Sequence, residues 1–163
     1  KASDMEVMQI NNNVAVRITN WSGHKLPTGY PEGRRMWVQV RYLDGDGTVM
    51  QEIGGYDYDE ATLDTNGTTI FEMQLGMDEA VAAAANLEPG KSFHLVLNNV
   101  VLKDNRIPPK GFTNAEFEAI LAAPVGENYV DGQHWHDSLY GIPSGVWYSV
   151  PSVWRFVFIW DKG

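Results

Sequence analysis

Residues 14–42 read VAVRITNWSGHKLPTGYPEGRRMWVQVRY, and this stretch decides the fold more than any other. Its two ends, 14–19 and 36–42, alternate apolar and polar side chains and contain many β-branched and aromatic residues. Alternation of this kind is typical of strands that bury one face. The sequence therefore predicts two strands joined by a long loop.

This loop is dense in glycine, proline and charged residues. Pro27 and Pro31 fix the backbone, and the glycines between them and the second strand allow turns that other residues disfavour. Loops held on a rigid scaffold are where binding groups concentrate. The side chains that such a loop would present are His24, Lys25, Tyr30, Arg34 and Arg35. The alternative is that the loop only makes two turns, with its arginines solvated or stacked on Tyr30 and Trp37.

Further strand signals lie on both sides of this stretch. Residues 1–13 mix charges with apolar side chains and could supply an edge strand. Residues 43–48 (LDGDGT) contain Asp-Gly twice, which favours a hairpin turn into a strand at 49–53. A calcium loop is the alternative, but it needs further oxygen ligands that this segment lacks at the right spacing.

Three later segments also have strand character. Residues 68–75 (TTIFEMQL) return to strand, and 92–101 (SFHLVLNNVV) predict a core strand with His94 among apolar neighbours. Residues 154–160 (WRFVFIW) are almost entirely apolar or aromatic, and they predict a central strand or a contact face.

Two short helices are expected between these strands. Asp78 precedes an alanine-rich run that ends before Pro89-Gly90. Thr113 and Glu116 have the spacing of a capping box, which predicts a helix to about Leu121. Many short strands with two helical inserts predict a mainly β protein. We expect one β-sandwich domain over 1–163, Ig-like or jelly-roll-like.

Composition excludes several function classes. The net charge of −9 and the pI of about 4.8 make nucleic acid an improbable partner. No run of about 18 apolar residues exists, so the sequence predicts no transmembrane segment. The basic residues fall in two clusters, which could form a local anion or carboxylate site if the fold brings them together, or could simply be solvated. These clusters are Lys25, Arg34 and Arg35, and Lys103, Arg106 and Lys110.

A pair of histidines, His134 and His136, is the clearest metal-binding candidate. Residues two apart on a strand point to one face, so both imidazoles could meet one metal ion, with His24 or Asp131 as a third ligand. The alternative is two surface histidines around a packed Trp135.

Three segments together carry a family resemblance. They are GHKLPTGYPEGRRMWVQVRYLDGDGTV (23–49), KDNRIPPKGFTNAEF (103–117) and APVGENYVDGQHWHDSLYGIP (123–143). In this order they resemble the haem-free β-domain near the C-terminus of many bacterial multihaem c-type cytochromes. The resemblance runs from about Val14 to about Pro143. The chain has no Cys, hence no C-x-x-C-H motif, so it would bind no haem covalently.

The resemblance implies where this chain works and what it meets. It implies a periplasmic or cell-surface location, as a fragment or a separate subunit of a larger assembly, and a multihaem c-type cytochrome as partner. In contact with haem c of that partner, His24, His134 or His136 could reach an iron or lie beside a propionate. Lys25, Arg34 and Arg35 could pair with the propionate charge.

Three functions from different classes follow. The first is a non-catalytic structural or docking domain that packs against or shields a haem of an electron-transfer protein. The second is a polysaccharide-binding β-sandwich module with exposed aromatic side chains beside acids. The third is a metal-dependent enzyme that uses His134 and His136. We assign no catalytic residue, because the serines lack a G-x-S-x-G elbow and no carboxylate pair is placed near a candidate acid.

Overall fold

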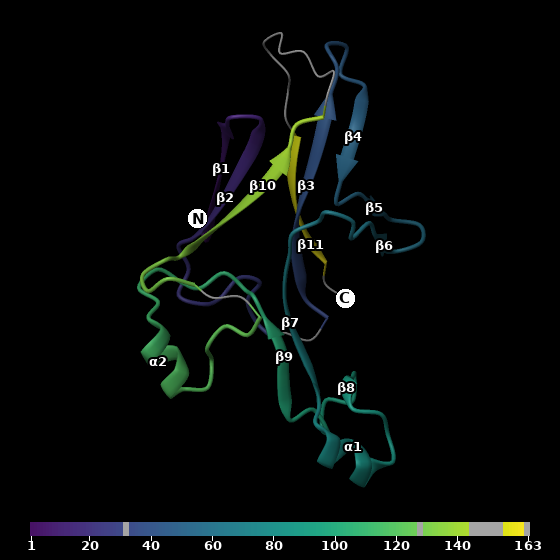
Figure 1. Ribbon diagram of the computed structural model, residues 1–163, viewed down its shortest axis with the longest axis vertical. Coiled ribbons are helices and arrows are strands. Elements are labelled where there is room, and N and C mark those ends of the chain that lie inside the picture. Colours follow the sequence, from purple (N-terminus) through teal and green to yellow (C-terminus); the bar gives the residue numbers. More distant parts are fainter. Residues whose placement is uncertain (31–32, 127–128, 144–154, 162–163) are drawn as a thin grey trace.

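The structure is a computed structural model that describes residues 1–30, 33–126, 129–143 and 155–161, the last of these as backbone only. Its smaller sheet is antiparallel and has the strand order β1-β2-β10 (Figure 1). These strands are β1 (Ser3–Ile10), β2 (Asn13–Asn20) and β10 (Trp135–Gly141). The edge strand and the strand over 14–19 that the sequence predicted are therefore confirmed.

The larger sheet is built around two long strands, β3 (Arg35–Leu43) and β7 (Ile70–Met77), which pair at one end. Its strand order is β11-β3-β7-β8, and two further strands pair with β3 and β7 off this path. The shorter members are β4 (Val49–Ile53) on β3, β8 (Gly90–Lys91) and β9 (Val100–Asp104) on β7, and β11 (Arg155–Asp161) on β3. A separate small hairpin pairs β5 (Tyr56–Asp57) with β6 (Thr62–Leu63).

The core lies between these two sheets. Side chains of β2 and β10 pack there against side chains of β3 and β7, and two loop residues complete the cluster. Burial of such apolar area is the main source of stability in a sandwich of this kind. The buried members are Val14, Val16, Ile18, Leu26, Met36, Val38, Val40, Tyr42, Phe71, Ile107 and Tyr140. The predicted mainly β, sandwich-like class is confirmed.

The hairpin between β3 and β4 forms as its Asp-Gly repeats predicted. The carboxylate Oδ1 of Asp44 accepts hydrogen bonds from the backbone N–H groups of Asp46 (3.0 Å) and Thr48 (2.8 Å). Gly47 has a φ of 85°, in the left-handed region that glycine enters without strain. The turn chemistry therefore accounts for Asp44, and no cation is needed to explain its position.

Both predicted helices are present and capped. Asp78 accepts a hydrogen bond from the N–H of Val81 at the start of α1 (Glu79–Ala85). Thr113 caps α2 (Asn114–Ala119): its hydroxyl accepts from the N–H of Glu116 at 3.4 Å and donates to the Glu116 carboxylate at 2.6 Å, so the predicted N-cap is confirmed, with a side-chain bond in place of the reciprocal backbone bond of a capping box. In Figure 1 α1 lies at the bottom of the view beside β8, and α2 lies at the lower left, below the ends of β1, β2 and β10.

The predicted core strand over 92–101, with a buried His94, is wrong. Strand structure begins only with β9, His94 is exposed, and Val96 is 96% exposed. The hydroxyl of Ser92 accepts from the N–H of His94, and the Asn98 amide donates to the Ser92 carbonyl oxygen at 2.9 Å. Such local hydrogen bonds compete with strand pairing and turn the chain back on itself.

The C-terminal aromatic run is a strand, as predicted, but its position differs. Strand β11 pairs with β3 and lies at the end of the larger sheet's strand order, so the prediction of a central strand is wrong. Trp154 and the side chains of β11 lie outside the described residues, and the predicted contact face lies there too.

Gly54 is a position where the sandwich leaves no room for a side chain. Its φ is 70°, a Cβ there would lie 2.6 Å from the carbonyl oxygen of Val38, and its own carbonyl accepts from the Trp37 indole. Gly67 has a similar φ of 65°, but a Cβ would meet only Ile53 at 3.8 Å.

These two glycines make a matched pair of substitutions. Gly67→Ala should cost about 1–2 kcal/mol through left-handed backbone strain alone. Gly54→Ala should cost about 1–3 kcal/mol more, because the new methyl group forces the backbone of β3 to shift. Urea unfolding of both variants measures the difference, and equal losses would contradict the close approach.

Candidate functional site

Three segments that are far apart in the sequence meet at one end of the sandwich. Leu26 and Ile107 exchange both backbone hydrogen bonds, at 3.0 and 2.9 Å, which ties the first loop to the segment after β9. Asp104 and Val125 do the same at 2.8 and 2.9 Å, which adds the segment after α2. We call the contacts among residues 20–26, 104–107, 122–125 and Tyr129 the loop junction.

Asn20, the last residue of β2, holds the first loop in place. Its side chain is fully buried, and its amide donates to the carbonyl oxygens of His24 (2.8 Å) and Ile107 (2.9 Å). Its carboxamide oxygen accepts from the N–H and the hydroxyl of Ser22. Every polar atom of this buried side chain is therefore used to fix the loop.

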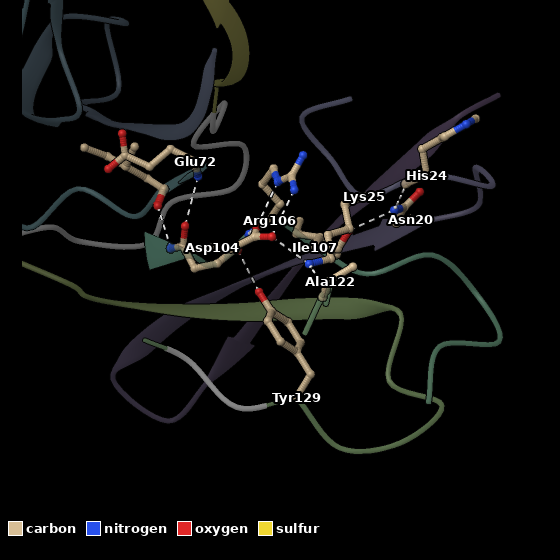
Figure 2. A network of polar contacts seen from close by, with 11 residues as sticks. Asn20, His24, Lys25, Glu72, Asp104, Arg106, Ile107, Ala122 and Tyr129 are labelled. Atoms are coloured by element: carbon tan, nitrogen blue, oxygen red, sulfur yellow. Dashed lines mark hydrogen bonds and ion pairs between the residues drawn. The ribbon is translucent and has the colours of Figure 1, made fainter. Parts of the chain in front are cut away.

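A buried carboxylate lies at the centre of the loop junction (Figure 2). Asp104 accepts from Arg106 at two oxygens, over 2.8 and 2.9 Å, and from the Lys25 ammonium at 2.7 Å. The side chains of Lys25 and Asp104 are only 6% and 3% exposed. Lys25 also donates to the carbonyl oxygen of Ala122 at 2.5 Å, and its ammonium lies 5.5 Å from the centre of the Phe117 ring.

The two partners of Asp104 control its ionisation. Burial alone would raise the pKa of this carboxyl group, but the hydrogen bonds from Arg106 and Lys25 hold the pKa below its ordinary value. Burial lowers the pKa of the Lys25 ammonium, and the bond to Asp104 offsets part of that effect. With both cations charged, this cluster has two positive groups for one negative group.

Asn105 and Tyr129 connect the cluster to the larger sheet. The Asn105 side chain accepts from the N–H of Glu72 (2.9 Å) and donates to the carbonyl oxygen of Ile70 (2.8 Å). The Tyr129 hydroxyl donates to the carbonyl oxygen of Asn105 at 2.9 Å. These bonds tie the loop junction to β7.

An open depression of about 460 Å³ lies between the first loop and α2. Cationic side chains, His24 and apolar groups share its lining. Its walls include His24, Lys25, Arg106, Pro109, Phe117 and Ile120. A hollow of this size and mixed polarity is in the range of small-ligand and side-chain binding sites.

A row of rings and cations lies on the surface next to this depression. The Lys110 ammonium lies 4.9 Å from the centre of the Trp21 ring, and the rings of Trp21 and His134 are 4.9 Å apart. The His134 ring is 5.2 Å from Trp135, which in turn lies 5.5 Å from the Arg17 guanidinium carbon. We call these five residues the aromatic stripe. Trp21 remains 47% exposed, so a partner can reach it.

The structure places the predicted binding residues of the first loop in different environments. His24 is exposed at the rim of the depression, whereas the Lys25 ammonium is bonded inside the protein and is not available to a partner's propionate. Arg34 donates to the carbonyl oxygen of Thr28 at 2.8 Å, and Arg35 lies over the Trp37 ring at 5.7 Å. A role for His24, Arg34 and Arg35 in haem or propionate contact stays a prediction.

The two basic clusters of the sequence come together only in part. Lys25 and Arg106 share Asp104, whereas Lys103 pairs with Glu72 at 3.1 Å. Lys110 belongs to the aromatic stripe. The anion site that the sequence suggested therefore has a carboxylate of the protein itself at its centre.

His134 and His136 meet different neighbours. His134 packs against Trp21 and Trp135, and its Nδ1 lies 3.0 Å from the carbonyl oxygen of Gly132. His136 meets the ring of Phe71 at 5.0 Å. Among the described residues no group of three or more His, Cys, Asp or Glu side chains is placed to hold a metal ion. Metal binding by this pair stays a prediction, as does polysaccharide binding.

Sequence reasoning missed Asn20 and Asp104. Asn20 directly follows the strand predicted at 14–19, and Asp104 is one of 21 acidic residues in an acidic chain. The only signal for Asp104 was its position between Lys103 and Arg106, in a segment that the family resemblance covers.

Comparisons with known proteins give one distant likeness. No family model and no curated protein matches the chain. Among solved structures it is similar to a penta-heme cytochrome c552 from Thermochromatium tepidum, with a TM-score of 0.48 and 17% identity. The similarity covers 88% of this chain and 28% of the cytochrome chain. A likeness at this level carries no functional argument, so function is argued from the site. Separately, no helix among the described residues is long and apolar enough to cross a membrane.

Removing the buried carboxylate should destabilise the fold. Asp104→Asn leaves Lys25 and Arg106 close together without their shared counter-charge, and breaking a buried ion pair typically costs about 3–5 kcal/mol. Asp46→Asn, in the exposed β3–β4 turn, removes the same charge and should change the unfolding free energy by less than about 0.5 kcal/mol. Urea unfolding at neutral pH compares the two, and equal effects would contradict the role of Asp104.

The same carboxylate should contribute to acid sensitivity. Because its pKa is lower in the folded chain than in the unfolded chain, its contribution to stability is present above the ordinary Asp pKa of 3.8. That contribution is lost as the pH falls through the lowered value. Between pH 5 and pH 3, Asp104→Asn should therefore lose less unfolding free energy than the parent and Asp46→Asn chains. A loss as large as that of the parent chain would contradict this assignment.

Proposed function

We propose that this chain is a non-catalytic docking domain that packs against a multihaem c-type cytochrome in an extracytoplasmic electron-transfer system. One observation carries the proposal. The three segments that resemble the haem-free domain of multihaem cytochromes, 23–49, 103–117 and 123–143, are the segments that meet at the loop junction. The residues that carry the resemblance thus build one surface and the hydrogen-bond network that supports it.

The chemistry of this surface suits a haem protein. The chain as a whole has a net charge of −9, yet Lys110 lies in the aromatic stripe and Arg106 lines the depression, whereas Arg17 of the stripe is already paired with Asp137 at 2.7 Å. Haem edges carry propionate groups, and Arg and Lys bind carboxylates through charge-assisted hydrogen bonds. Trp and Arg are also the residues that most often dominate binding energy at protein interfaces.

The loop junction explains why this surface needs no partner to keep its shape. Asn20 and the Asp104 cluster fix the first loop through bonds of 2.7–2.9 Å between buried groups. A surface that is already ordered loses less conformational entropy on binding. Of the three candidate histidines, His24 is the exposed one and is therefore the best placed to lie beside a haem.

The experiment begins by identifying the partner. The immobilised chain is exposed to a periplasmic extract of the source organism, and bound haem is read by its absorption and by peptide sequencing of the haem-stained band. The purified cytochrome is then titrated by biolayer interferometry. Trp21→Ala should weaken binding at least tenfold, because a central aromatic anchor of an interface typically contributes about 2 kcal/mol or more.

Tyr58→Ala is the matched control. Tyr58 is 75% exposed, lies between β5 and β6 and belongs to neither the aromatic stripe nor the depression. Its loss should leave the affinity unchanged. The proposal would be overturned if the immobilised chain retained no haem protein. It would also be overturned if the Trp21→Ala and Tyr58→Ala chains bound the cytochrome equally well.

A further inference from the structure

We infer that the depression between the first loop and α2 binds a carboxylate that carries an apolar group. This inference rests on the lining of the depression, not on the docking function proposed above. Its volume of about 460 Å³ accommodates a ligand of that kind, and its lining combines cationic and apolar side chains.

The positive charge of the lining favours an anion. Lys25 and Arg106 both line the depression, and among the residues that the structure describes the only carboxylate bonded to them is that of Asp104. One positive charge therefore remains uncompensated in a largely buried cluster. A second carboxylate placed against Arg106 would balance it, and charges in such a partly buried position are screened less by salt than charges on an open surface.

Arg106 has donors left for this second carboxylate. Its Nε and Nη2 bond to Asp104, and its Nη1 donates to no residue in the part of the chain that the structure describes. The bidentate bond to Asp104 holds the guanidinium plane still, so the free edge is already oriented. Lys25 contributes its charge but not a bond, because its ammonium is bonded to Asp104 and Ala122 and faces the Phe117 ring.

The walls select for an apolar group on the ligand. Phe117 packs edge-on against the buried ring of Phe112, with ring centres 4.8 Å apart, which fixes its position on α2. Ile120 lines the depression while 70% exposed, and Pro109 closes another side. A ligand chain or ring that covers Ile120 removes apolar surface from water, which adds to the affinity for its carboxylate.

The test uses 3-phenylpropionate as the probe and its neutral amide, 3-phenylpropanamide, as the comparison. For a ligand of this size in an open site we expect a dissociation constant of about 1 mM for the acid. In ¹⁵N-resolved NMR titrations the acid should shift the Arg106 side-chain N–H signal, and the amide should bind at least tenfold more weakly. Equal binding of acid and amide, or no shift of the Arg106 signal with 20 mM acid, would overturn the inference.

Two substitutions of one exposed residue separate charge from packing. Ile120→Asn removes the apolar contact and should weaken binding of the acid about threefold. The Asp side chain of Ile120→Asp has nearly the same shape as the Asn side chain of Ile120→Asn, but it adds a negative charge at the mouth of the depression. Ile120→Asp should therefore weaken binding of the acid at least tenfold. Val96→Asp adds the same charge at a 96% exposed position outside the depression and should have no effect. Equal affinities of Ile120→Asp and Ile120→Asn would contradict a carboxylate site.

A competition experiment distinguishes the two sources of such a carboxylate. If the natural group is a haem propionate or an acidic side chain of a docked protein, 3-phenylpropionate will compete with capture of the cytochrome. If it is a free small carboxylate, the cytochrome and the probe will bind together. Either result supports the site, and the two results differ only in the source of the carboxylate. The existence of the site is tested by the NMR titrations above.

Discussion

The rest of the structure depends on one buried carboxylate that two cations share. Asp104 is almost fully enclosed, and an ionised carboxylate in that position is tolerated only because Arg106 and Lys25 both bond to it. Its backbone also pairs with Val125. The first loop, the end of β9 and the segment after α2 therefore converge on the same residue.

This constraint also shapes the surface above it. Because two cations serve one carboxylate, the loop junction has an excess positive charge on a protein that is otherwise acidic. The depression and the aromatic stripe are built on that base, with Trp21 anchored by its position directly after the buried Asn20. The proposed docking to a haem protein and the proposed carboxylate binding would both use this one electrostatic arrangement, and they can be tested separately.

Local patterns predicted the elements well and failed where side-chain chemistry opposed them. Alternation located β2 and β3, Asp-Gly located the β3–β4 turn, and Thr113 with Glu116 located α2. Residues 92–99 also alternate, but Ser92 and Asn98 bond to nearby backbone groups and turn the chain before β9. Pattern alone could not weigh those hydrogen bonds against strand pairing.

The sequence by itself determined the mainly β class, the two capped helices, the acidic charge and the absence of thiol chemistry, because each depends on local pattern or on composition. Only the tertiary structure decided which charges meet. Lys25 and Asp104 are 79 residues apart in the chain, and no local rule pairs them. The fold brings them within 2.7 Å, and in doing so it turns a predicted binding lysine into an internal support and leaves Arg106 at the surface of the depression.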